Sequence, residues 1–376
     1  LAKSNICTIH SFCLDVIKNN FFEIDISPNF RIGTEEEISL LKQEVLEDVF
    51  EDFYEQEDEE FLKLIEAYAE YKGDERLKEI VLKLFEFSRS APFPEEWLEE
   101  KIQMFSPNNE IEDFGKTVWG KILLKELEEV IIDGKNNLKM LQNKMMKFNE
   151  LDKFTSVILQ DIEVLNGLEN ALNKSWDSAF EFEINFDRWP ADKNVTLPLK
   201  DEAKDLRVKI RKKINDSKND ILLYNSEDAF RDLFEMYDIL IALEKVVLKF
   251  EEEFQSQKKE KNIIDFNDIE HFALKILLKK DGNENYIPTE VAKRYAQKFE
   301  EIAIDEYQDS NQVQEYILTS ISNGKNIFMV GDVKQSIYKF RRACPDLFLN
   351  KYENYDLNGN DKGLKIQLFK NFRSRK

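Results

Sequence analysis

The chain is poor in cysteine, histidine, glycine and proline, and each shortage excludes a class of protein. Three cysteines and two histidines without paired spacing argue against a zinc-stapled or disulfide-stapled fold and predict reduced thiols. Eleven glycines and eight prolines are too few for a turn-rich β protein. No apolar run approaches the roughly 20 residues that a membrane span needs, and no secretory signal opens the chain. We therefore expect a soluble, cytoplasmic protein.

The composition predicts a mostly α-helical chain with a smaller α/β part. Hydrophobic residues make up 42% of the sequence, enough for substantial cores, and charged residues make up 34%. A length of 376 residues exceeds what one hydrophobic core usually organises. We therefore expect two or more structural units.

The charge is distributed unevenly along the chain. A net charge of −21 argues at first sight against a polyanionic partner, because phosphate binding depends on local lysine and arginine. Residues 325–376, however, carry 12 basic against 5 acidic residues, whereas residues 35–62 carry 13 acidic residues against Lys42 alone. The acidic run is typical of a solvated helix face. A bound nucleic acid should follow the basic C-terminal part and avoid the acidic helix.

Residues 26 to about 255 show the periodicity of amphipathic helices, with apolar residues at three- and four-residue steps. The stripe that runs from Leu138 to Leu172 predicts one very long helix or two in line. Residues 206–221 and 230–254 predict a helical hairpin joined at 224–226. Core packing explains these stripes better than any ligand site, and we assign them no chemistry.

Two segments, one within this helical stretch and one at its end, are less regular. Residues 180–198 contain two prolines and mixed polarity, which predicts a loop or irregular crossing. Residues 255–261 are polar and rich in lysine, which predicts a link back to the first domain. A helix should begin near Ile264, with Asn267 or Asp268 as its cap.

The two ends of the chain predict strands and helices in alternation. The first 25 residues predict a strand that runs into a helix. Short apolar runs before Asp305 and at 326–330 predict two further strands, and a helix and an alternating strand at 364–368 should follow Pro345. This order is typical of a parallel nucleotide-binding sheet.

The strand before Asp305 ends in two adjacent carboxylates, in the string IAIDEYQDSN of residues 302–311. Nucleotide hydrolysis needs two acids at such a position, one to hold Mg²⁺ and one to orient and deprotonate the attacking water. Asp305 suits the first role and Glu306 the second. Taken as a dipeptide alone, the pair is better explained as solvated charge at the end of an ordinary strand.

Three further strings change that balance. The second apolar run leads into GDVKQSIYKFR at residues 331–341, LFKNFRS lies at residues 368–374, and TIHSFC lies at residues 8–13. These four strings, in this order, resemble the motifs of superfamily 1 DNA helicases of the UvrD, PcrA and RecB type. They look most like those of the AddA family, the helicase-nuclease subunits of bacterial AddAB. The string DFNDI of residues 265–269 is similar to one that precedes the magnesium-binding motif in these proteins.

The resemblance implies ATP and Mg²⁺ as cofactors and gives four residues a role. Asp305 would coordinate Mg²⁺, Glu306 would be the catalytic base, and Gln335 would sense the γ-phosphate. Arg373 would reach that phosphate from a second domain. Glutamine suits sensing because its amide both donates and accepts, and arginine suits the clamp because its fork matches phosphate oxygens. Gln308 and Asp309 should support this site or link it to the DNA path, and Asp332 is either part of it or a turn-former.

A second set of residues has the composition of a single-stranded DNA site. Aromatic side chains stack on bases while basic ones follow phosphates, and Tyr338, Phe340 and Arg341 directly follow Gln335. Core packing of the two aromatics is the alternative. Many members of the resembled family have glycine where this chain has Arg342, which puts close backbone approach to DNA in doubt there.

The N-terminal motif has the same implied role. Thr8, His10 and Ser11 can donate to phosphate oxygens, and the similar motif of the family contacts DNA. A core histidine is the competing interpretation of His10.

The resemblance also shows an absence. No Gly-x-x-x-x-Gly-Lys-Ser/Thr loop exists in this sequence, which begins at Leu1 just upstream of the N-terminal motif. We expect a fragment that lacks this phosphate loop and the nuclease domain, with little ATP turnover of its own.

The implied architecture is an incomplete RecA-like P-loop NTPase domain with a parallel sheet. Residues 1–25 and 256–355 would form RecA-like domain 1A, residues 26–255 a helical 1B-type insertion, and residues 356–376 the start of domain 2A. The implied function is a 3′-to-5′ single-strand DNA translocase and helicase in double-strand break repair, acting on single-stranded and duplex-end DNA with an AddB-like subunit. The alternative is a helical DNA-binding or subunit-interaction module without ATPase activity.

Overall fold

The computed structural model describes residues 5–68, 73–107, 111–192, 194–335, 345–359 and 363–368. Most of these residues lie in α-helices, and three short two-stranded sheets accompany them, which confirms the mostly helical prediction. The chain divides into two compact units: a terminal unit of Leu1–Ile102 with Ile239–Lys376, and a central unit of Gln103–Asp238. In the described part of the chain, no helix is long and apolar enough to cross a lipid bilayer.

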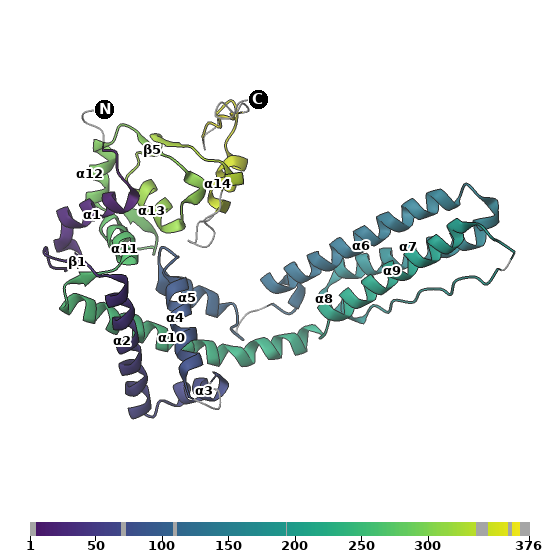
Figure 1. Cartoon of the computed structure of the whole chain (residues 1–376), viewed down its shortest axis with the longest axis horizontal. Coiled ribbons are helices and arrows are strands. Elements are labelled where there is room, and N and C mark those ends of the chain that lie inside the picture. Colours follow the sequence, from purple (N-terminus) through teal and green to yellow (C-terminus); the bar gives the residue numbers. More distant parts are fainter. Residues whose placement is uncertain are drawn as a thin grey trace. The chain divides into compact units, whose positions relative to one another are not determined.

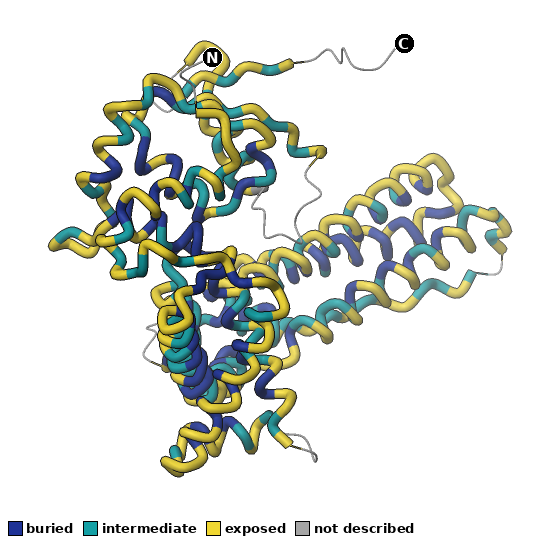
Figure 2. Tube along the Cα trace, turned by 60° about the vertical axis from the view of Figure 1, so that its left-hand side comes forward, coloured by how far each residue is buried: buried dark blue, intermediate teal, exposed yellow. Residues whose placement is uncertain are grey.

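The central unit is a bundle of long helices, in which α6 packs against both α7 and α9 (Figure 1). Thr117 caps α6 by accepting the backbone N–H of Gly120. Buried positions recur along the facing sides of the helices (Figure 2). The helices are α6 (Val118–Met145), α7 (Asp152–Lys174), α8 (Trp176–Glu181), α9 (Pro198–Ile221) and the first part of α10 (Ser226–Glu260).

Two predictions about these helices were wrong. The chain turns after α6 through a short 3-10 helix, η3 (Asn149–Leu151), and α7 packs back on α6 instead of continuing in line. α9 packs along α6 rather than forming the predicted hairpin with α10. Apolar periodicity specifies which face of a helix is buried, but not which helix covers it.

Residues 182–192 and 194–197 are irregular, as predicted, and basic side chains of α9 bind carbonyls in them and at the end of α8. Arg207 Nη2 donates to the carbonyl of Asp187 at 2.7 Å and Lys200 Nζ to that of Val195 at 2.7 Å, while Lys218 Nζ donates to that of Phe180, in the last turn of α8, at 2.9 Å. These bonds satisfy carbonyls that have no partner in a helix or sheet.

The helical part of the terminal unit has the acidic face expected from the sequence. Thr34 caps its first helix by accepting the N–H of Glu37 at 3.2 Å. The apolar stripe of that helix is buried, and most of its acids are exposed. The helices of this part are α2 (Glu35–Glu55), α3 (Glu59–Tyr68), α4 (Glu75–Ser88), α5 (Pro94–Gln103) and the second part of α10.

The remainder of the terminal unit is an α/β part. Its helices are α1 (Ile9–Asn20), α11 (Phe266–Leu277), α12 (Glu290–Lys298), α13 (Gln312–Ser320) and α14 (Pro345–Asn354). α11 packs against α1 and α13. Its strands pair as β1 (Arg31–Ile32) with β2 (Ile263–Ile264) in parallel, β3 (Leu278–Lys280) with β4 (Tyr286–Pro288) antiparallel, and β5 (Ile302–Ile304) with β6 (Ile327–Met329) in parallel. The pairing of β1 with β2 joins the two flanks of the long helical stretch.

Four local predictions fail in this unit. Residues 5–8 form no strand before α1, and α10 runs through residues 255–260, where a polar link was expected. The N-cap of α11 is Asp265, with Asp268 as the returning partner of a capping box, so neither Asn267 nor Asp268 is the cap. Residues 363–368 contain one isolated bridge, from Leu364 to Asp356, instead of a strand, because a strand needs a hydrogen-bonded neighbour along its length.

Candidate functional site

The predicted acid pair lies at the carboxyl edge of the parallel strands β5 and β6. Ile302 pairs with Ile327 and Ile304 with Met329, so both strands end at the same edge. One further hydrogen bond, from the N–H of Tyr307 to the carbonyl of Val330 at 2.9 Å, joins the segments that directly follow the two strands. This edge is where open parallel sheets bind ligands.

Asp305 and Glu306 are both exposed at this edge. Asp305 Oδ1 accepts the N–H of Glu306 at 3.0 Å. Glu306 has a left-handed backbone, with φ of 51° and ψ of 40°, a conformation that costs a non-glycine residue about 1 kcal/mol or more. Such strain at a chemically active side chain is typical of functional sites.

Buried Gln308 links Glu306 to the segment after β6. Its Nε2 donates to Glu306 Oε2 at 2.6 Å, and its Oε1 accepts the N–H of Asp332 at 3.0 Å. Because a backbone N–H can only donate, the orientation of the Gln308 amide is determined. Gln335 Nε2 then donates to Asp332 Oδ2 at 2.9 Å. The structure thus connects Glu306 with Gln335 through two residues, a connection named here the 306–335 relay.

Asp332 both forms a turn and belongs to the relay. Its Oδ1 accepts the N–H of Lys334 at 3.0 Å, while its Oδ2 receives Gln335. The hydrogen bond from Gln335, followed by that from the Lys334 N–H, lowers the pKa of the Asp332 carboxyl. The two alternatives for Asp332 are therefore compatible.

Gly331 allows the relay to close. A Cβ at this position would lie 2.5 Å from Gln308 Oε1 and 2.9 Å from the ring of Phe348. Any larger residue would displace the Gln308 amide, which joins the segments that follow β5 and β6. Close packing around this position therefore explains why the string has a glycine there.

Asp309 provides a further carboxylate near the edge. Burial, and then the negative charge of Glu306, raise the pKa of the Asp309 carboxyl. Its Oδ1 is buried without a hydrogen-bond partner in the described part of the chain. An orphaned oxygen of this kind is a natural acceptor for a water or ligand group.

The donor set at this edge fits a nucleotide-bound magnesium ion. Mg²⁺ prefers oxygen ligands and is usually held by one or two carboxylates together with phosphates and water. Asp305 offers an exposed carboxylate of which one oxygen receives a single backbone N–H. The described residues contain no group of three or more histidine, cysteine, aspartate or glutamate side chains that would form a complete protein cage for a metal.

The N-terminal motif forms the first turn of α1. Thr8 is its N-cap and accepts the N–H of Ser11 at 3.3 Å, and the two hydroxyls lie 3.0 Å apart. His10 has a side chain that is 41% exposed, which argues against a core histidine. The ring of Phe266, at the start of α11, lies edge-on at 6.2 Å, and that residue is 59% exposed.

Two residues of this region were not singled out from the sequence. Phe266 was noted only as part of the string before the acid motif, although an aromatic residue in the first turn of a helix could have signalled it. Glu270 was not noted at all, although a glutamate between Ile269 and Phe272 breaks an apolar run and so marks a buried carboxylate.

Several predicted residues lie outside the described part of the chain. They are Tyr338, Phe340, Arg341, Arg342 and Arg373. The roles implied for these residues stay predictions.

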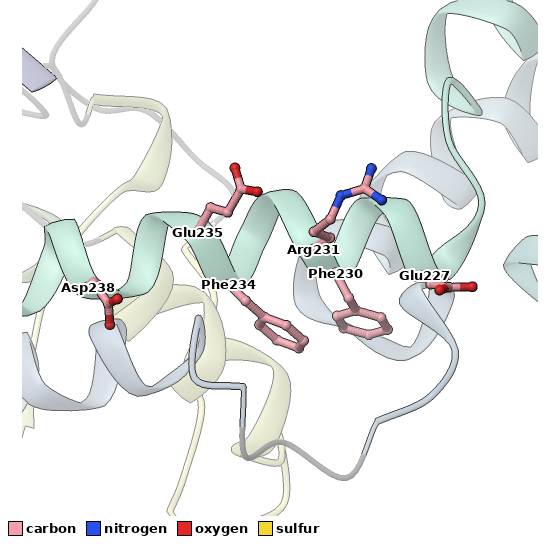
Figure 3. A pocket seen from close by; sticks show the side chains of 6 residues that line it. All are labelled: Glu227, Phe230, Arg231, Phe234, Glu235 and Asp238. Carbon is pink, nitrogen blue, oxygen red and sulfur yellow. The ribbon is translucent and has the colours of Figure 1, made fainter.

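A surface hollow is present in the central unit, and none of the predicted site residues lines it. It follows one side of α10 and is lined by Glu227, Phe230, Arg231, Phe234, Glu235 and Asp238. The rings of Phe230 and Phe234 lie on the same side of the helix, with centroids 5.6 Å apart (Figure 3). An open helix face of this kind does not bring catalytic groups together, and we assign it no chemistry.

Comparison with known proteins agrees with the geometry. The family described as UvrD/REP helicase N-terminal domain matches residues 1–356. Proteins named as ATP-dependent helicase/nuclease subunits of the AddA type are similar over the whole chain, and three of them are those of Clostridium kluyveri at 43% identity, Clostridioides difficile (strain 630) at 41% and Clostridium botulinum (strain Loch Maree / Type A3) at 39%. The chain covers 31%, 30% and 32% of these proteins, respectively, and so spans about a third of their length. With residues 1–356 matched to that domain and a carboxylate pair at the expected sheet edge, the chain belongs to the UvrD/REP helicase family.

Proposed function

We propose that this chain is part of an ATP-dependent 3′-to-5′ single-strand DNA translocase and helicase of the AddA kind. The parent protein would act in double-strand break repair in the cytoplasm, on single-stranded and duplex-end DNA, with an AddB-like subunit. The 306–335 relay at the carboxyl edge of β5 and β6 carries this proposal. It joins the predicted base and the predicted γ-phosphate sensor in one hydrogen-bonded unit.

The residues at this edge have separate tasks in the proposed ATPase. Bound ATP and Mg²⁺ would supply the electrophilic phosphorus and neutralise the charge that develops on the phosphate oxygens. Asp305 would hold the metal, and Glu306 would accept a proton from the attacking water on one carboxylate oxygen, while Gln308 donates to the other, Oε2. Gln335 would change partner from Asp332 to the phosphate, and Arg373 would contact the same phosphate from the second domain.

The proposed DNA contacts lie at the start of α1 and in the residues that follow Gln335 in the sequence. Thr8 and Ser11 donate hydroxyl protons to phosphates, His10 contacts the DNA beside them, and exposed Phe266 offers a ring on which a base can stack. Tyr338, Phe340 and Arg341 extend the path after Gln335. Because these residues follow the relay directly, rearrangement of Gln335 with nucleotide state would shift the DNA contacts.

The domain assignment belongs to the same proposal. Residues 1–25 and 256–355 form the RecA-like domain 1A, and residues 356–376 begin domain 2A. The parallel pairing of β1, near the start of the 26–255 stretch, with β2, just after its end, brings the two ends of that stretch together, as an insertion into one domain requires. That stretch, proposed as the 1B-type insertion, includes the whole central unit and the α2 to α5 helices of the terminal unit.

Single-stranded DNA binding by the purified chain tests the proposal. Loss of one base–aromatic stack costs about 1–3 kcal/mol, so Phe266→Ala and Tyr338→Ala should each weaken binding of a labelled oligothymidylate about ten-fold. Phe22→Ala is the matched control, because Phe22 is also an exposed phenylalanine, at 64%, but lies outside the proposed site. Equal losses for Phe22 and Phe266, or none, would remove the proposed DNA path.

The second candidate function is a helical binding module without ATPase activity. Three lysines on the exposed side of α9 favour it, since basic side chains on one helix face suit a phosphate backbone: Lys204, Lys209 and Lys212. A Lys209→Glu/Lys212→Glu double variant that abolishes DNA binding, with Tyr338→Ala silent, would support this function over the translocase.

ATP turnover gives a separate check. We expect little turnover from this chain alone, because its sequence has no phosphate loop. Appreciable turnover that Glu306→Gln abolishes would contradict that expectation while supporting the role of Glu306.

A further inference from the structure

The carboxylate of Glu270 joins three segments that are distant in sequence. It lies on α11 and is buried, with 8% of the residue exposed. Gln314 Nε2 donates to its Oε1 at 2.7 Å, and Asn311 Nδ2 donates to its Oε2 at 3.2 Å. His10 Nε2 lies 3.5 Å from Oε1. One buried carboxylate therefore faces the N-terminal motif and the start of α13 together.

The two amides at this junction have determined orientations. Asn311 is the N-cap of α13, and its Oδ1 accepts the N–H of Gln314 at 2.8 Å. Its NH₂ group must therefore be the one that faces Glu270. Asn311 also ends the segment that begins with Asp305 and Glu306, so Glu270 anchors the chain just after the acid motif.

The Glu270 carboxylate, which can only accept, also lies beside the His10 ring. An ionised carboxylate can only accept, so the imidazole nitrogen nearest to it carries a proton. This leaves Nδ1 and the exposed part of the ring, beside Phe266, for other contacts. We propose that Glu270 is a positioning residue for single-stranded DNA: it holds the proton of His10 on Nε2 and so presents Nδ1 as an acceptor for an N–H of a base in DNA whose phosphates lie along Thr8 and Ser11. This inference rests on the DNA-binding function proposed above.

A purely structural role for Glu270 makes a different prediction. Such a glutamate would satisfy Asn311 and Gln314, and the state of the half-exposed His10 would be independent of it. The distinction is measurable because the chain has only two histidines. The second, His271, is buried and its Nε2 donates to the carbonyl of Arg89 at 2.9 Å, so it serves as an internal reference.

The first experiment reads the tautomers of both histidines by nitrogen NMR on the chain labelled with ¹⁵N-histidine. In the wild type, both rings should carry their proton on Nε2. Glu270→Gln is close to isosteric, but its amide can donate as well as accept, so the His10 signals should become those of a tautomer mixture while the His271 signals stay unchanged. Glu290→Gln, at an exposed glutamate of α12, is the matched control and should change neither.

Two results of that experiment would overturn the inference. One is a wild-type His10 protonated on Nδ1, which needs no variant and so does not depend on the folding of Glu270→Gln. The other is a His10 tautomer that is the same in Glu270→Gln as in the wild type.

The second experiment measures binding of labelled oligothymidylate in a double-mutant cycle of Glu270→Gln and His10→Ala. Each single variant should bind about five-fold more weakly, and the double variant should lose little more, because both remove the same contact. Additive losses would overturn the positioning role alone. Wild-type affinity in His10→Ala would instead remove His10 from the proposed DNA site, and the inference about Glu270 with it, whereas loss through Phe266→Ala would still support the DNA path.

Discussion

Two aspartates of the terminal unit show how differently this protein uses a carboxylate. Asp268 is fully buried and saturated: Lys258 Nζ donates at 2.6 Å, Arg89 Nη2 at 3.0 Å, Gln255 Nε2 at 3.1 Å and the N–H of Asp265 at 2.9 Å. Burial alone would raise the pKa of the Asp268 carboxyl, but the positive charges of Lys258 and Arg89 outweigh it and hold the pKa below its usual value.

Asp305 is the opposite case. It is exposed, and a single backbone N–H reaches its Oδ1 at 3.0 Å. A saturated carboxylate has no lone pair left for a ligand and can only hold elements together, here α4, α10 and α11. An exposed carboxylate with few partners contributes little to folding and keeps its oxygens for chemistry. Asp161 of the central unit, buried against Arg207 at 2.5 Å and 2.9 Å, is of the first kind.

The largest expected effect contrasts these two aspartates directly. Asp268→Ala removes one acidic partner from each of the buried cations Lys258 and Arg89, which keep only Asp265 and Glu251, so the free energy of unfolding should fall by about 3–5 kcal/mol. Asp305→Ala should change it by less than about 0.5 kcal/mol, because the side chain is at the surface. Urea unfolding followed by circular dichroism measures both. Equal destabilisation by the two variants would break the comparison.

A smaller loss of stability is expected at the relay. Gly331→Ala places a Cβ 2.5 Å from Gln308 Oε1 and should destabilise the protein by about 1–3 kcal/mol through overpacking. Gly282→Ala is the control, since a Cβ there would meet nothing within 4 Å. If Gly331→Ala is as well tolerated as Gly282→Ala in thermal unfolding, the closed arrangement of Gln308 and Asp332 is wrong.

The pH dependence of stability should report the buried ring of His271. Burial, and then the positive charge of Arg89, lower the pKa of His271 to about 3 from a value near 6.5. Between these values the unfolded chain binds the proton and the folded chain does not, so stability falls as pH drops below about 6.5. The expected loss from this residue is about 2 kcal/mol between pH 7 and pH 5. A His271→Gln variant should show a correspondingly shallower slope in unfolding midpoints, and an unchanged slope would contradict the assignment.

The smallest effect has the opposite sign. Glu306→Gly removes the left-handed strain at φ of 51° and should raise stability by about 0.5 kcal/mol, after the entropy cost of glycine is subtracted. Glu57, with φ of 48°, is the matched control, and Glu57→Gly should give a similar gain. Only the change at Glu306 should affect nucleotide chemistry. A loss of stability at Glu306 alone would show that its side-chain bond to Gln308 outweighs the strain.

Much of the candidate site could be predicted because its determinants are local in sequence. A short apolar run that ends in two acids predicts a strand with carboxylates at its tip, and β5 confirms it at Ile302–Ile304. The second run is confirmed in the same way as β6, and its Gly331 and Asp332 fall where a tight turn needs them. The family match agrees with these strings.

Most of the failures share a physical cause. The continuation of α10 through residue 260 and the partner of α9 depend on contacts with other segments of the chain. Lys258 illustrates this: in the sequence it belongs to a polar, lysine-rich run, yet it is 1% exposed, because Asp265 and Asp268 neutralise it in the fold. The cap of α11 is different, because its capping box joins Asp265 and Asp268, which are three residues apart.

The sequence by itself determined the helical character, the buried faces and the positions of the acid pair and glutamines, since periodicity and adjacency act over a few residues. Only the tertiary structure decided which carboxylates are saturated and which stay open. That outcome depends on which donors arrive from elsewhere in the chain: Arg89 and Lys258 reach Asp268, Asn311 and Gln314 reach Glu270, and one backbone N–H reaches Asp305.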